Sequence, residues 1–203
     1  MTTPAARRGR PRSERAREAT LDVTMTLLLE RGLAGTGMDA VAAAAGVSKA
    51  TIYRWWPTKQ SLAMDALYRE WSAVPPATDT GALREDLRGL LLPWANLVAR
   101  RPYGRVFVGL LVEVLSDPDF ALEYRSRFVE NRREEGRLIL QRAIGRGEVS
   151  PDIRIEVVLD LLYGPIYHRM LHGHAALDDR FVGEVIDTVL DGIRTAAVRD
   201  ERP

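Results

Sequence analysis

Residues 38–59 read MDAVAAAAGVSKATIYRWWPTK, and this stretch decides how the chain is organised. Apolar and small residues recur in it at the spacing of one helical face: Met38, Val41, Ala42 and Ala45. Gly46 follows, and glycine adopts the positive φ of a tight turn without steric cost. Ser48 is typical of an N-cap, and the helix that it begins extends to Trp56, since Pro57 stops it. Two short helices joined by such a turn predict a helix-turn-helix.

The second of these helices carries the chemistry. Val47 and Ile52 are predicted to anchor it, so its outward side is formed by Lys49, Ala50, Thr51, Tyr53 and Arg54. Lysine, threonine and tyrosine donate hydrogen bonds to base edges and phosphate oxygens, and an alanine or threonine methyl contacts the methyl group of thymine. The pattern therefore favours a recognition helix for the major groove of DNA. The alternative is an ordinary helical hairpin with a solvated face.

Helical spacing continues on both sides of this motif. Upstream, a helix is predicted over residues 13–31, with Ser13 as its N-cap and Gly32 ending it. Downstream, a helix is predicted over 58–72 with Thr58 as its N-cap. Its buried side should include Leu62, Ala66 and Leu67.

Residues 73–80 (AVPPATDT) are predicted to form a linker, because adjacent prolines are excluded from a helix interior. Bends are expected beyond it at Pro93 and at Gly164–Pro165, and Asp117 is a predicted N-cap. Five longer helices are predicted there, over 80–100, 103–116, 118–144, 152–172 and 178–197.

No alternating pattern of a strand competes with these helices, so the predicted fold class is all-α. The predicted division is a flexible basic arm over residues 1–12, a helix-turn-helix unit with its connecting helix over 13–72, and a helical domain over 80–197.

The composition is that of a globular protein, with 203 residues, 46% hydrophobic and 28% charged. The absence of cysteine excludes disulfides, cysteine-ligated zinc, iron–sulfur clusters and thiol nucleophiles. No apolar run approaches the about 18 residues of a membrane span, and no apolar segment follows the arginine-rich start as in a signal peptide. A cytoplasmic protein is therefore expected.

The net charge of +1 conceals an uneven distribution of charge. Residues 1–72 hold eleven Lys and Arg against seven Asp and Glu, whereas residues 73–203 hold 18 against 21. Residues 7–17 contain six arginines and a single acidic residue, Glu14. A basic arm on a neutral body suggests a polyanionic partner, and a solvated tail is the alternative.

From Arg17 to Leu67 the chain resembles the DNA-binding domain of the tetracycline-repressor (TetR) family of bacterial transcriptional regulators. The matching residues are Gly32, Thr36 and AGVSKATIYRWWPTKQSL at 45–62. The resemblance implies an all-helical protein whose variable second domain binds a small molecule and forms a homodimer through the last two helices. It also implies that double-stranded operator DNA is the partner of the first domain.

The family's DNA contacts can be carried over to matching positions of this chain. Thr36 and the start of the second helix would meet phosphate, and Trp55 replaces the His or Tyr that packs on a phosphate. Gly37 stands where Ser or Thr often caps the second helix, and Trp56 fills an aromatic position in the core. The implied DNA-binding residues are Thr36, Gly37, Ser48, Lys49, Ala50, Thr51, Tyr53, Arg54, Trp55, Thr58 and Lys59.

A ligand pocket is expected between the helices at 80–100, 103–116 and 118–144, closed by the helix that follows. Its candidate residues are Trp94, Tyr103, Phe107, Leu110, Glu113, Phe128, Tyr163 and Tyr167. Most of these side chains are apolar, so the expected effector is largely apolar or aromatic. For each aromatic residue, packing in the core is the alternative. Glu113 lies either at a surface edge, or buried with a partner, or in the pocket, where it would favour a cationic ligand.

The last two helices carry apolar stripes, and these either form a two-fold interface or pack within one subunit. His168, His172 and His174 invite a metal interpretation, but no cysteine and no H-E-x-x-H motif completes a ligand set. No metal or other cofactor is therefore predicted.

The predicted function is a sequence-specific regulator, a repressor released from a palindromic operator by a small effector. The alternative is a helix-turn-helix DNA-binding or accessory protein that needs no effector. An enzyme is not expected, because the sequence contains no G-x-S-x-G, Walker A or G-x-G-x-x-G motif.

Overall fold

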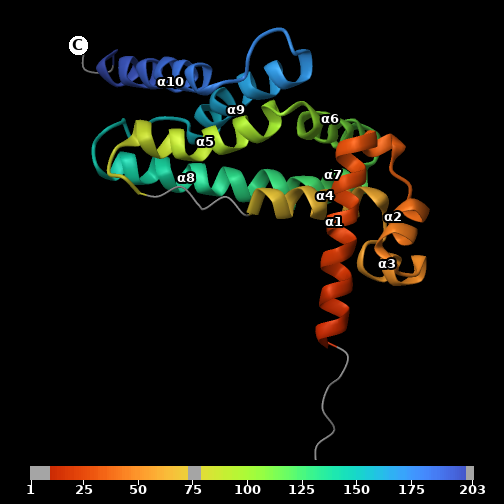
Figure 1. The fold of residues 1–203 in the computed structure, drawn as a ribbon. Coiled ribbons are helices and arrows are strands. Elements are labelled where there is room, and N and C mark those ends of the chain that lie inside the picture. The colour runs from red at the N-terminus through yellow and green to blue at the C-terminus, as the bar shows by residue number, and fades with distance from the viewer. Residues whose placement is uncertain (1–9, 73–78, 200–203) are drawn as a thin grey trace, which may run out of the picture.

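The computed structural model describes residues 10–72 and 79–199, and these residues form helices joined by short connections, with no strand among them (Figure 1). The helices are α1 (Arg10–Gly35), α2 (Met38–Ala45), α3 (Lys49–Trp55), α4 (Lys59–Ser72), α5 (Leu83–Ala99), α6 (Arg101–Ser116), α7 (Pro118–Tyr124), the π-helical turn η1 (Arg125–Val129), α8 (Glu130–Gly145), α9 (Ile155–His172) and α10 (Asp179–Arg199). The predicted all-α class is confirmed.

Helix α1 begins at Arg10, three residues before the predicted N-cap Ser13. Pro11 lies in its first turn, where an N–H group has no partner within the helix. The prediction of Ser13 as the N-cap is therefore wrong, and the predicted arm is already helical from Arg10 onward. At the other end, Gly32 has φ 71° and ψ 177°, so the helical path is interrupted where the sequence predicted its end.

Two predicted segments fall on parts of the chain outside the described residues. Residues 1–9 contain most of the predicted arm, and residues 73–78 contain most of the predicted linker.

The first four helices share one core. α1 packs against α2 and α4, and α3 joins them through Ile52, which is fully buried. The other large side chains of this core come from α1, from the end of α3 and from α4: Leu28, Trp56, Leu62, Met64 and Leu67. Figure 1 shows α2 and α3 beside α1 at one end of the molecule, with α10 far from them.

The remaining helices form the larger part of the molecule. α5 lies between α8, α9 and α10, and its buried side includes Leu83, Leu87, Leu90 and Trp94. Helices α8 and α9 approach closely at Gly136, where a Cβ atom would lie 2.5 Å from Cδ2 of Leu159. Pro93 and Pro165 lie inside α5 and α9, and both helices continue past them.

The helix predicted over 118–144 contains the unpredicted π-helical turn η1. Buried residues along this segment follow one another in steps of four: Phe120, Tyr124, Phe128, Arg132 and Gly136. In an α-helix of about 3.6 residues per turn, four such steps rotate by about 160° away from one face. The wider π turn recovers part of that rotation. Three aromatic residues in steps of four are the sequence signal for this turn.

One side of α6 contacts the N-terminal helices. Arg105, Gly109 and Glu113 are four residues apart and therefore share a helical face. Nη2 of Arg105 donates to the carbonyl of Leu29 at 2.7 Å, and a Cβ on Gly109 would lie 3.1 Å from Cβ of Leu33. Glu113 accepts a hydrogen bond from α4. This face of α6 is a direct connection between the two halves of the molecule.

Candidate functional site

Helix α3 is positioned by its cap and by one buried residue. The hydroxyl of Ser48 accepts a hydrogen bond from the backbone N–H of Thr51 at 3.2 Å, and the two hydroxyls lie 2.9 Å apart. This is the predicted N-cap, and it satisfies one of the free N–H groups of the first turn. Because Ile52 is fully buried, the opposite side of this short helix faces away from the protein.

The outward side of α3 is polar and accessible. Lys49, Ala50, Tyr53 and Arg54 are exposed, and Thr51 is half-buried, which agrees with the predicted orientation of this helix. The ammonium group of Lys49 forms an ion pair with Asp39 of α2, and this hydrogen bond raises the pKa of Lys49. Two cationic side chains and a phenol therefore lie along the exposed edge of α3.

The two tryptophans that end this segment have different environments. Trp55 is half-buried, and the guanidinium carbon of Arg54 lies 5.6 Å from its ring centroid. Trp56 is only 2% exposed and packs edge-on against Trp55 with centroids 5.5 Å apart. The predicted place of Trp56 in the core is confirmed. Its Nε1 also donates to Oδ2 of Asp65 at 2.7 Å.

The start of α4 has the predicted cap. Oγ1 of Thr58 accepts from the backbone N–H of Ser61 at 3.0 Å and lies 2.8 Å from the Ser61 hydroxyl. Lys59, the first residue of α4, is half-buried. Thr58 is exposed.

The predicted contact between Thr36 and phosphate requires a correction. The Thr36 side chain is 2% exposed, and its hydroxyl donates to the carbonyl of Gly32 at 2.8 Å. This hydroxyl is therefore used inside the protein to close the turn after the interruption of α1. Gly37 is exposed as the N-cap of α2, and no side chain caps that helix. Backbone N–H groups are what this terminus offers to an anion.

Asp65, a residue that the sequence analysis did not single out, joins three elements. Its carboxylate accepts from Trp56 at the end of α3, from Arg17 of α1 at 3.1 Å, and from Arg127 of η1. Only 11% of its side chain is exposed. We call these four residues the Asp65 junction. The sequence signal that could have identified Asp65 is the occurrence of an acid within the apolar run LAMDAL.

Most of the predicted ligand residues are core residues. Leu110 is buried in the core, and Trp94, Phe107, Phe128 and Tyr163 belong to a buried group of rings together with Tyr124 and Tyr167. We call these six rings the aromatic cluster. Trp94 lies 4.9 Å from Tyr167 and 5.8 Å from Tyr163, and Phe107 lies 5.3 Å from Phe128, all between centroids.

A cavity of about 300 Å³ borders this cluster, and Tyr163 and Tyr167 are the two predicted residues that line it. Arg132 also lines it, and no sequence pattern had assigned this residue a role. Its guanidinium lies 5.1 Å from the Trp94 ring centroid and 5.7 Å from that of Tyr163, and burial lowers its pKa to about 10. A buried cation over aromatic faces is stabilised by the ring quadrupoles.

Tyr103 and Glu113 face α4 instead of this cavity, which corrects their predicted place. The Tyr103 hydroxyl donates to Oε2 of Glu70 at 3.3 Å. Nε2 of Gln60 donates to Oε2 of Glu113 at 2.8 Å. Both acceptors are carboxylates at the contact between α4 and α6. Glu113 is thus the half-buried acid with a partner, one of the three alternatives.

The three histidines lie close together at the end of α9. Their ring centroids are 4.6 Å apart for His168 and His172, and 5.0 Å apart for His168 and His174. All three are exposed. Over residues 10–72 and 79–199, no group of His, Asp and Glu is arranged to hold a metal ion.

Within residues 10–72 and 79–199, none of the helices has both the length and the apolar character that crossing a membrane requires.

Comparisons with known proteins cover both halves of the chain. The profile of bacterial regulatory proteins of the tetR family matches residues 21–70, and that of the tetracyclin repressor-like C-terminal domain matches residues 77–189. The uncharacterized HTH-type transcriptional regulator YdeS of Bacillus subtilis is 33% identical over 195 residues, which is 96% of this chain and 98% of that protein.

Two further proteins support the same relationship. The DNA-binding transcriptional repressor TetR of Mycobacteroides abscessus is 32% identical over 88% of this chain and 94% of its own length. The crystal structure of the TetR family transcription regulator SCO0332 superposes with a TM-score of 0.75 at 34% identity, covering 88% of this chain and 98% of that one.

Proposed function

The chain belongs to the TetR family of bacterial transcriptional regulators, which are not enzymes, and on that premise we propose that it is an effector-responsive repressor of a palindromic operator. Residues 13–72 would form the DNA-binding unit and residues 80–197 the unit for effector binding and dimerisation. A regulator of this kind acts on the chromosome, so we place it in the cytoplasm.

The observation that carries this proposal is the outward side of α3. Its N-terminal residues Lys49 and Ala50 are exposed ahead of Tyr53, and a recognition helix presents its N-terminal residues to the major groove. Lys59 and the N-terminus of α2 flank this edge, where they suit contacts to phosphate. We propose that Thr51 contacts a base and that Lys59 contacts phosphate.

A second copy of the chain is the proposed partner of α9. The sequence left open whether the apolar stripe of α10 forms an interface or packs within one subunit. Its residues Phe181, Val185 and Val189 are buried within the subunit. The other side of α9 carries exposed apolar residues: Val157, Leu161 and Leu171. At about 100° per residue these three residues lie within about 80° of one another around the helix, so they form one stripe. We propose that this stripe pairs with its copy across a two-fold axis.

The proposed effector site is the cavity at Arg132, Tyr163 and Tyr167. Tyr163 and Tyr167 support the expected largely apolar or aromatic effector, while Arg132, Arg133 and Asp160 add charged groups to the lining. Phe128 of η1 belongs to the aromatic cluster, and the neighbouring Arg127 contacts Asp65. A shift of η1 on effector binding would therefore reach α3 through the Asp65 junction.

The coupling between effector binding and operator binding requires a minimum free energy. An effector weakens operator binding only by as much as it prefers the conformation that binds DNA poorly. A hundredfold loss of operator affinity corresponds to about 2.7 kcal/mol of such preference.

The DNA-binding proposal is tested by selecting duplexes from a random library and by footprinting the selected sites. We expect a palindrome with half-sites about one helical turn, or a multiple of it, apart. Lys59→Ala should lower affinity for all sequences and reduce the salt slope by about one, whereas Thr51→Ala should change base preference by about 1–3 kcal/mol. A monomer bound to a single asymmetric half-site would contradict the proposal.

The effector site is tested with 1-naphthol as a probe of an aromatic ligand. We expect 1-naphthol to lower the affinity of the wild-type protein for the selected duplex. Tyr167→Ala should weaken this response while duplex binding persists. If 1-naphthol lowers the duplex affinity of both proteins equally, the effector site does not lie at Tyr167. Duplex binding that no compound in a wider aromatic panel alters would instead favour the effector-independent alternative.

A further inference from the structure

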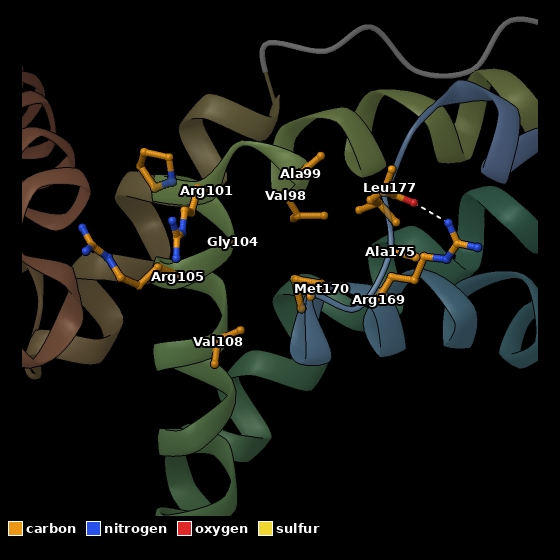
Figure 2. Close-up of a pocket in the computed structure, with 13 residues that line it drawn as sticks. Val98, Ala99, Arg101, Gly104, Arg105, Val108, Arg169, Met170, Ala175 and Leu177 are labelled. Atoms are coloured by element: carbon orange, nitrogen blue, oxygen red, sulfur yellow. Dashed lines mark hydrogen bonds between the residues drawn. The ribbon is translucent and has the colours of Figure 1, made fainter.

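A second and larger cavity, of about 940 Å³, lies between the start of α6 and the end of α9 (Figure 2). None of the aromatic cluster is among the residues that line it. Its walls come from the end of α5, the first turns of α6, the last turn of α9 and the loop that follows α9. Much of the lining is apolar and includes Val98, Val108, Met170 and Leu177.

Three arginines also line this cavity, and no acidic residue does so among the described residues that surround it. Arg105 donates to two backbone carbonyls of α1, and Arg169 donates to the carbonyl of Ala176 and lies over the Phe181 ring at 3.4 Å. Carbonyls and rings carry no formal charge, so these contacts do not offset the charge of either guanidinium. Arg101, the third arginine, is exposed at the start of α6.

Two of the three arginines come from α6, and the N-terminus of that helix makes its wall of the cavity more positive still. The first turn of α6 lies in one wall, and its N-terminus has no side-chain cap, so its N–H groups add partial positive charge there. The opposite wall contains the C-terminal end of α9, whose partial negative charge is offset by Arg169 of the same turn. The Arg169 guanidinium is already engaged by the Ala176 carbonyl and the Phe181 ring. An anion is therefore favoured at the α6 wall, and an apolar group beside Met170 and Leu177.

We propose that this cavity binds an amphipathic carboxylate, with the acid group against Arg101 and Arg105 and the apolar chain against Val108, Met170 and Leu177. Arginine binds carboxylates through two parallel N–H donors, which suits it to this position. The volume lies within the range of small-molecule pockets, about 300–1,000 Å³. Figure 2 shows Arg101 and Arg105 on one side of the space and Met170 and Leu177 on the other.

Arg105 connects this cavity to the DNA-binding half. Its Nη2 donates to the carbonyls of Leu29 at 2.7 Å and Glu30 at 3.2 Å, just before the interruption of α1 at Gly32. A carboxylate forms a stronger hydrogen bond with a guanidinium than a neutral carbonyl does. A bound acid would therefore draw Arg105 away from α1. This consequence for operator affinity rests on the proposed function, whereas the binding itself does not.

Binding is tested by calorimetry with the full chain and decanoate, with 1-decanol as the uncharged analogue of equal chain length. We expect decanoate to bind at least tenfold more tightly than decanol, because only decanoate pairs with the arginines. Equal affinities for the two compounds, or no binding of decanoate, would overturn the proposal.

The place of binding is tested with variants that keep the fold, as checked by thermal unfolding. Arg101→Gln should weaken decanoate binding at least tenfold, and Met170→Trp, which enlarges a side chain of the apolar wall where the chain would lie, should abolish it. The matched control is Arg154→Gln, an exposed arginine at the other end of α9, which should bind as the wild type does. Wild-type binding of decanoate by folded Met170→Trp would overturn the proposal.

The consequence for DNA is tested with the selected duplex. We expect saturating decanoate to lower duplex affinity at least tenfold in the wild type and to leave Met170→Trp unaffected. Decanoate binding without any change in duplex affinity would show that the connection through Arg105 is wrong. A chain that binds no duplex at all would contradict the proposed function, and calorimetry would still decide whether the cavity binds the acid.

Discussion

The recognition segment at residues 38–59 and the aromatic cluster differ in what places their side chains. The segment presents Lys49, Tyr53 and Arg54 outward from one short helix, whose cap and buried anchor lie within the same segment. The rings of the cluster come from α5, α6, α7, η1 and α9. Their arrangement therefore depends on the packing of all five elements and not on any one pair of helices. A surface for binding a long polymer needs only local geometry, whereas an enclosed site needs several helices at once.

The two regions also differ in their exposure to solvent. Side chains on the outward side of α3 contribute little to folding because water surrounds them in either state. The cluster is buried, so changes within it alter stability first and function second. Variants in the two regions should therefore separate loss of function from loss of stability.

The largest effect is expected for Trp94→Ala in the aromatic cluster. Trp94 is fully buried against Phe107 and Tyr167, so the change should lower the free energy of unfolding by about 3–5 kcal/mol. Tyr53→Ala on the outward side of α3 is the matched change, and it should stay within about 0.5 kcal/mol while it weakens duplex binding. Urea unfolding measures both. Equal destabilisation by the two variants would contradict the contrast.

A smaller effect is expected for Asp65→Asn, which alters the contact between the regions. Arg17 and Arg127 each lose a charged partner, and Arg127 keeps only its ion pair with Glu123, so stability should fall by about 1–3 kcal/mol. Asp160→Asn is the control, because that carboxylate pairs with Arg133 but is 68% exposed, and it should cost about 0–1 kcal/mol. Denaturation curves of both variants check this. A cost for Asp65→Asn no larger than that of Asp160→Asn would leave no structural role for the Asp65 junction.

A pH-dependent effect is expected at Asp86 at the start of α5. Burial alone would raise the pKa of this carboxyl, but hydrogen bonds from Thr80 at 2.6 and 2.7 Å and the charge of Arg146 hold the pKa below its usual value. Its stabilising contribution is therefore complete above the ordinary carboxyl pKa of about 4 and is lost as the pH falls through the lowered pKa.

Asp86→Asn should accordingly cost about 1–2 kcal/mol of unfolding free energy at pH 7. The difference from the wild type should shrink as the pH falls below about 4, where the wild-type carboxyl takes up a proton. Thermal unfolding across this range measures it. A difference that stays constant down to pH 2 would show that charge on Asp86 does not contribute.

The smallest change in stability is expected for Asp39→Asn, which frees Lys49 from its ion pair. Both side chains are substantially exposed, so stability should change by less than about 0.5 kcal/mol. Duplex affinity should rise severalfold, because a negative charge disappears beside the proposed groove contact. Fluorescence titration with the selected duplex measures this. A fall in affinity would indicate that Asp39 orients Lys49 for DNA instead of competing with it.

The sequence by itself determined the all-α class, the helix-turn-helix and the outward side of α3, because caps and turn glycines act over a few residues. The N-cap Ser48 and the anchor Ile52 were predictable for that reason, whereas the buried place of Trp56 was implied by the family resemblance. Where local signals competed, the prediction was wrong, since Pro11 starts α1 ahead of the better capping residue Ser13.

Only the tertiary structure decided which aromatic residues are core and which line a cavity. Burial depends on neighbours distant in the chain, and a helical stripe does not say what packs against it. Hence Tyr103 and Glu113 face α4, Thr36 turns inward, and the cation at Arg132 lies among rings. The Asp65 junction and the α6–α9 cavity depend in the same way on contacts between residues dozens of positions apart, which no periodicity records.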